Sequence, residues 1–127
     1  MANKRPSLIK TRNIAFKSQQ GKCFYCELPM WVENISCFCI LNKISEQKAR
    51  QFQCTGEHIV AFSDGGSADI SNIVACCKFC NHKRHARKNL LEPKDYKKLV
   101  LKRLRKGKWN LPLLKSNRNI SINIRIS

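Results

Sequence analysis

Acidic residues are scarce in this sequence: eight Asp and Glu stand against 25 Lys and Arg among 127 residues, so the formal charge is +17. Such an excess of positive charge indicates a polyanionic partner. Long apolar runs are also missing, because no segment approaches the roughly 18–20 residues that a membrane-spanning helix needs. The basic C-terminal half lacks the aromatic face of a membrane-surface helix. We therefore expect a nucleic acid as the partner and no association with a membrane.

The N-terminus has little of a secretory signal, since basic residues open the chain but no apolar stretch follows them. Without export the expected localisation is cytoplasmic, where thiols stay reduced. The eight Cys residues are therefore expected to be metal ligands before disulfide partners. A chain of this length suits one small domain, whose core is marginal unless a metal site stabilises it.

Apolar spacing and turn residues predict an α+β fold with one small domain. Helices are expected at 7–20, shortly after Ser45, at 78–88 and from Pro93 to about Lys106, and strands at 58–62 and 72–76. Asp64–Ser67 is expected to form the turn between the strands. The expected organisation is a basic N-terminal helix or arm (1–22), a core (23–90) with an insertion (33–52), and a basic C-terminal helix and tail (91–127).

Two Cys-x-x-Cys pairs, Cys23/Cys26 and Cys77/Cys80, have the spacing of knuckles that together bind one tetrahedral Zn²⁺. The alternative is two unrelated pairs of buried thiols, but two such pairs in a reduced compartment favour structural zinc. The long gap between the pairs exceeds that of a zinc ribbon, so further structure is expected between them.

The other four Cys residues carry a weaker signal. Cys76 lies in an apolar run and is expected to be a small core residue. Cys37, Cys39 and Cys54 either contribute to a second metal site or are buried thiols without a metal, and no fourth ligand is evident.

A longer pattern lies between and around the knuckles. In order it comprises Glu57-His58, an apolar stretch, Gly65-Gly66, Asn72, a second apolar stretch, Cys77-x-x-Cys80 and Asn81. This pattern resembles the motif of the HNH endonuclease family. The resemblance implies a ββα-metal core, in which two short antiparallel strands and a helix surround one catalytic divalent cation, with the zinc knuckles outside it. It also implies products with 5′-phosphate and 3′-hydroxyl ends.

The resemblance implies catalytic roles for His58, Asn72 and Asn81. His58 would be the base that activates water, which suits an imidazole near neutral pH, and Asn72 would hold the strand that carries it. Glu57, Asn81 and His85 would bind Mg²⁺ or Mn²⁺. Asn81 and His85 are four residues apart, so they share one helix face. The family usually has Asp at the position of Glu57. The alternative to a ligand role for Glu57 is that of a surface acid, and the alternative for His85 is a contact with phosphate.

Basic residues continue along the same helix. Lys83, Arg84, Arg87 and Lys88 are expected to contact DNA phosphates, although a charge run is otherwise an ordinary solvated face. Phosphate contacts carry no base information, so no recognition sequence is predicted.

The sequence therefore predicts a metal-dependent HNH endonuclease that hydrolyses DNA, expected to be double-stranded, as a restriction or homing type of enzyme. One motif cuts one strand, so double-strand cleavage would require a homodimer or two nicks. The alternatives are a zinc-containing DNA-binding module without catalysis, favoured by the longer Glu57, and an RNA-cleaving nuclease.

Overall fold

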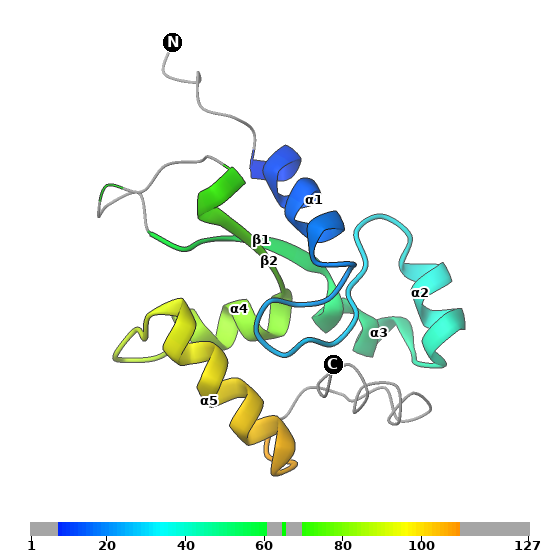
Figure 1. Ribbon diagram of the computed structural model, residues 1–127. Helices are drawn as coiled ribbons and strands as arrows, with labels where there is room; N and C mark the ends of the chain where they lie inside the picture. Colours follow the sequence, from blue (N-terminus) through cyan, green and yellow to red (C-terminus); the bar gives the residue numbers. More distant parts are fainter. Residues whose placement is uncertain (1–7, 61–64, 66–69, 110–127) are drawn as a thin grey trace.

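The computed structural model describes residues 8–60, 65 and 70–109 (Figure 1). Its centre is an antiparallel pair of strands, β1 (Cys54–His58) and β2 (Ile73–Cys77). The helices around this pair are α1 (Leu8–Ser18), α2 (Ile35–Asn42), α3 (Glu46–Ala49), α4 (Lys78–His85) and α5 (Pro93–Arg105), with 3₁₀ turns at Arg50–Phe52 and Ile70–Asn72. The predicted α+β class is confirmed. Within these residues no helix is long and apolar enough to cross a membrane.

Helices α1 and α4 pack against the strand pair from opposite sides (Figure 1). Strand β2 is buried along its whole length. Its outer edge is closed by Gln19, just beyond α1, whose side-chain amide accepts from the N–H of Ala75 at 2.9 Å and donates to its C=O at 2.8 Å. Because the backbone groups of a buried strand need partners, this amide replaces a third strand.

Helix α5 closes the core on the side of α4. Pro93 occupies its first turn, a position that suits proline. Tyr96, Val100 and Leu104 are four residues apart and form its buried stripe. Tyr96 packs edge-on against Tyr25, with ring centroids 4.9 Å apart, and its hydroxyl donates to the C=O of Cys80 at 3.1 Å. This stripe therefore joins α5 to the segment that carries the cysteine pairs.

The segment 33–52, predicted to be an insertion, is mostly helical. Asn34 accepts from the N–H of Cys37 and so begins α2, while Ser45 accepts from the N–H of Lys48 and begins α3, as the sequence predicted for that helix.

The prediction for the first strand is wrong in its position. The strand was expected at 58–62, but β1 ends at His58, where that stretch begins. The N–H of Ile59 still donates to the backbone C=O of Asn72 at 2.8 Å, but from Val60 onward the side-chain amide of Asn72 replaces the strand partner, bonding the N–H and the C=O of Val60 at 2.8 and 2.9 Å. The predicted turn at Asp64–Ser67, apart from Gly65, and the tail from residue 110 onward lie outside the described residues.

We expect Gln19→Ala to lower the free energy of unfolding by about 1–3 kcal/mol, because the buried N–H of Ala75 loses its acceptor. Denaturant unfolding followed by circular dichroism measures the change. Ser18→Ala, at the exposed end of α1, is the matched control and should leave stability unchanged. Equal effects of the two variants would contradict the role of Gln19 at the edge of β2.

Candidate functional site

The two Cys-x-x-Cys pairs meet in the core. Cys23 and Cys26 lie in the turn after α1, Cys77 ends β2, and Cys80 lies in the first turn of α4. The four Sγ atoms lie within 4.8 Å of one another, and all four side chains are buried. The Sγ atoms of Cys26 and Cys77 are 4.0 Å apart, close to the roughly 3.8 Å edge of a tetrahedron with Zn–S bonds of about 2.3 Å.

Backbone N–H groups favour thiolates in this cluster. The N–H groups of Tyr25, Cys26 and Cys77 donate to Sγ of Cys23 at 3.3–3.4 Å. Burial alone would raise the pKa of Cys23, but hydrogen bonds from Cys26, Cys77 and Cys80 hold it well below its usual range. Burial raises the pKa of Cys26 and Cys80. Four buried thiolates would repel one another without a cation, so the donor set fits Zn²⁺.

The remaining Cys residues do not join a second cluster of three or more metal-binding side chains within the part of the chain that the structure describes. Cys37 is exposed and Cys39 is half-buried, both on α2. Burial raises the pKa of Cys54 to about 11, so its thiol stays neutral. Cys76 is fully buried, which confirms its predicted place in the core.

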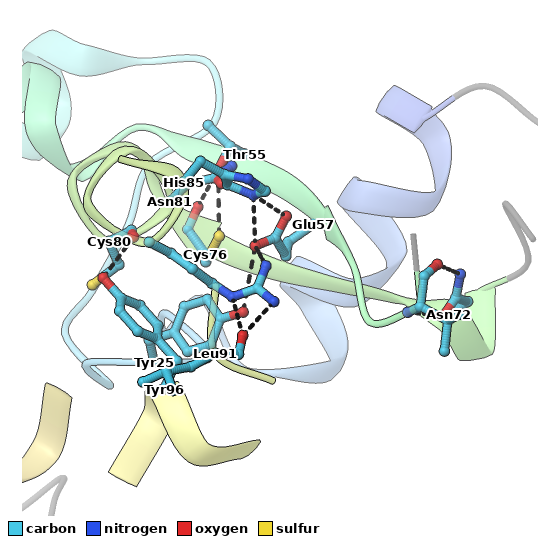
Figure 2. Close-up of polar contacts among 12 residues, drawn as sticks. Tyr25, Thr55, Glu57, Asn72, Cys76, Cys80, Asn81, His85, Leu91 and Tyr96 are labelled. Atoms are coloured by element: carbon cyan, nitrogen blue, oxygen red, sulfur yellow. Dashed lines mark hydrogen bonds and ion pairs between the residues drawn. The ribbon is translucent and has the colours of Figure 1, made fainter. Parts of the chain in front are cut away.

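Glu57 is the centre of a second polar cluster (Figure 2). Its side chain is 7% exposed, whereas that of His85 is 51% exposed. Nε2 of His85 lies 3.0 Å from Oε1 of Glu57, and Nη1 of Arg84 donates to Oε2 at 2.7 Å. The hydroxyl of Tyr25 donates to the same Oε2 at 3.4 Å. Nε2 of His85 also lies 3.2 Å from Oε2. Glu57 is therefore a buried carboxylate whose Oε2 is held by Arg84 and whose two oxygens both lie beside an exposed imidazole.

Asn81 lies one turn before His85 on α4, and its position is fixed from β1. Nδ2 of Asn81 donates to Oγ1 of Thr55 at 3.0 Å, and that hydroxyl donates to the C=O of Cys76 at 2.7 Å. Since the amide nitrogen is engaged, Oδ1 is the atom of Asn81 that remains for a ligand. The structure thus brings Glu57, Asn81 and His85, the three predicted cation ligands, to one side of the strand pair (Figure 2).

These side chains fit a divalent cation. Oε1 of Glu57 and Nε2 of His85 are 3.0 Å apart, the separation of neighbouring ligands of an octahedral cation with bonds of about 2.1 Å. Arg84 engages Oε2, which leaves Oε1 for the cation. The exposure of His85 leaves room for water or substrate on the open side, as a catalytic cation requires.

His58 follows Glu57 at the end of β1. Regular pairing with β2 places the two side chains on opposite faces of the sheet, and Nε2 of His58 is shielded from solvent. The bonds between Asn72 and Val60 hold the backbone just after His58. The catalytic support that the resemblance implies for Asn72 stays a prediction. The structure thus fixes the strand end that carries the predicted base, but it does not bring the side chain of His58 together with that of Glu57.

The expectation that Arg84 faces DNA needs correction. Its side chain is 6% exposed, and Nε and Nη2 donate to the C=O of Leu91 at 3.1 and 2.7 Å while Nη1 binds Glu57. Arg84 therefore has no free face for phosphate. Lys83 and Lys88 are exposed and Arg87 is half-buried, so these three remain available.

Sequence reasoning missed the contacts of Tyr25 and Arg84 with Glu57. For Arg84 a signal was present, because it follows the buried zinc-ligand candidate Cys80 by four residues and so shares its helix face. For Tyr25 the only signal was its position between two knuckle cysteines.

Removal of one thiol tests the cysteine cluster. We expect Cys77→Ser to lose bound zinc and to unfold at a much lower temperature, because a structural metal contributes directly to folding. Zinc content by atomic absorption and a thermal melt measure both effects. Cys37→Ser, which removes an exposed thiol outside the cluster, is the control. Unchanged zinc content in Cys77→Ser would refute the four-cysteine site.

Comparisons with known proteins agree with this geometry. Residues 44–87, about a third of the chain, match the family model described as HNH endonuclease. A curated protein named Anaredoxin from Nostoc sp. (strain PCC 7120) is 42% identical over 33 residues, which are 26% of this chain and 43% of that protein. The chain thus matches less than half the length of that relative. No solved structure matches.

The family match spans β1, β2 and α4 and contains Glu57, His58, Asn72, Asn81 and His85. The predicted resemblance to the HNH endonuclease family is therefore confirmed over residues 44–87.

Proposed function

We propose that the protein is a metal-dependent HNH endonuclease that hydrolyses phosphodiester bonds in DNA. The observation that carries this proposal is the 3.0 Å approach of Glu57 Oε1 to the exposed His85 Nε2, with Asn81 one turn earlier, inside the segment that matches the family. The net charge of +17 supports a polyanionic substrate.

Each residue has a separate task in this proposal. Glu57, Asn81 and His85 hold Mg²⁺ or Mn²⁺, which when bound supplies positive charge beside the phosphate and the leaving oxygen. His58 takes the proton of the attacking water. Asn72 keeps the end of β1 in place through Val60. Lys83, Arg87 and Lys88 neutralise phosphates along the substrate.

The setting of the reaction is part of the same proposal. Double-stranded DNA is the proposed substrate, in a restriction or homing type of role, and two copies of the chain or two successive nicks would cut both strands. Free thiols throughout the described residues suit the cytoplasm, where cysteine–zinc sites persist.

One observation favours a DNA-binding module without catalysis. The guanidinium of Arg84 is buried against Glu57 at 2.7 Å, so the carboxylate already has a permanent positive partner. A cation beside it would lie close to that guanidinium and be repelled. The affinity of the site for a divalent cation therefore discriminates between the two functions.

We expect His85→Ala to weaken Mn²⁺ binding by at least about tenfold, because the open ligand of the site is lost. Electron paramagnetic resonance of free Mn²⁺ measures the affinity in zinc-loaded protein. His82→Ala removes an exposed imidazole from the same helix and is the matched control. No Mn²⁺ binding by the wild type would favour the non-catalytic module.

We expect the wild type to nick supercoiled plasmid with Mg²⁺ or Mn²⁺, and His58→Ala to be slower by about 10²- to 10⁴-fold, the usual contribution of a general base. Gln47→Ala, an exposed substitution on α3 that is purified in the same way, is the control and should cut as fast as the wild type.

Equal rates of cutting by the wild type and His58→Ala would show that His58 is not the general base. DNA binding without cutting in either cation would establish the module instead. Faster cleavage of an RNA of matched sequence would assign the protein to the RNA-cleaving alternative.

A further inference from the structure

A groove of about 410 Å³ runs along the outer edge of β1, between α1 and the first half of α4. Leu8, Ile9 and Arg12 of α1 form one wall, and Lys78, Asn81 and His82 of α4 form the other. Arg12, Lys78 and His82 have no role in the proposed cation site or in the proposed hydrolysis. The groove is nevertheless continuous with the candidate cation site, because Asn81 belongs to both.

The charge of this groove has one sign. Arg12 and Lys78 are permanent cations at neutral pH, and no carboxylate is among the described residues that line it. The nearest buried acid of β1, Glu57, does not line the groove and is neutralised by Arg84. A polyanion in the groove would therefore meet attraction from both walls without repulsion from its lining.

Arg12 is positioned in advance. Its Nε and Nη2 both donate to Oδ1 of Asn13, at 3.1 and 2.9 Å, which fixes the plane of the guanidinium and leaves Nη1 for an incoming oxygen. A fixed guanidinium loses less conformational entropy on binding phosphate than a free one.

The close approach of α1 to β1 depends on Gly56. A Cβ at this position would lie 3.0 Å from Cδ1 of Leu8 and 3.4 Å from Cβ of Arg12, so a side chain here would push α1 and Arg12 outward. Gly56 pairs with Ala75 and lies between two ladder hydrogen bonds, one made by Gln53 and one by Ile59. In this register the N–H and C=O of Gly56 do not bond β2, so they are directed away from it, along the groove. The N–H of Gly56 and two cations thus face the same space.

We propose that this groove binds the phosphodiester backbone of the DNA strand that leads to the candidate cation site, with Arg12 and Lys78 on its phosphates. The proposal rests on the proposed function for the identity of the ligand. It adds a second contact surface, contributed by α1, to the basic residues of α4. Leu8 and Ile9, exposed on the rim, would contact the sugars.

The test measures binding of a short mixed-sequence DNA duplex to zinc-loaded protein over a salt series, without an added divalent cation. Each of Arg12→Gln and Lys78→Gln should weaken binding for every sequence and reduce the slope of log affinity against log salt by about one unit. Lys17→Gln, an equal change of charge on the exposed end of α1 outside the groove, should leave the slope unchanged.

Thermal melts of the three variants check that each is folded. Arg12 and Lys78 lie on different helices, so an equal loss of binding in Arg12→Gln and Lys78→Gln points to the groove and not to a local defect in one helix. If the wild type binds and cuts DNA while Arg12→Gln and Lys78→Gln match Lys17→Gln, the groove proposal is wrong and the nuclease function stands. If the wild type neither binds nor cuts DNA, both are wrong.

Discussion

Four buried thiols within 4.8 Å of one another connect three parts of the chain: the turn after α1, the end of β2 and the first turn of α4. In a core this small, the junction determines how β2 continues into α4. Cys77 is both the last residue of β2 and the N-cap of α4, where its Sγ accepts from the N–H of Cys80 at 3.4 Å. The direction of α4, and with it the position of every side chain on that helix, follows from the cysteine cluster.

Helix α4 and the residues directly after it present three pairs of side chains, each four residues apart, to three different surroundings. Cys80 and Arg84 face the core, Asn81 and His85 face Thr55 and Glu57 on β1, and Lys83 and Arg87 line a cleft of about 260 Å³ with Arg103 of α5. A single helix of eight residues can serve a structural metal, a candidate catalytic cation and a basic surface because these pairs are separated around its axis. Arg84 nevertheless connects two of these surroundings, because it also binds Glu57 of the candidate cation site.

The parts of this arrangement that depend on local spacing could be predicted from the sequence. The Cys-x-x-Cys pairs, the shared face of Asn81 and His85, and the helix beginning at Pro93 each follow from distances along the chain. The end of β1 could not be predicted, because His58–Phe62 is rich in strand-forming residues and the bond from Asn72 to Val60 joins residues far apart in sequence. The burial of Arg84 was missed for a similar reason: its partners, Glu57 and the C=O of Leu91, are supplied by β1 and by the segment after α4.

The distribution of the few acidic residues accounts for the strength of the basic surface. Glu57 is buried against Arg84, Glu27 lies 3.7 Å from Lys97, and Glu46 lies 3.7 Å from Arg50. Three of the eight acids are thus committed to local partners, whereas both walls of the groove beside β1 and the cleft beside α5 are lined by cations. Because the potentials of such clefts add, both would attract a polyanion toward α4. Asn81, which lines the groove beside β1, is one of the residues that the proposed chemistry needs.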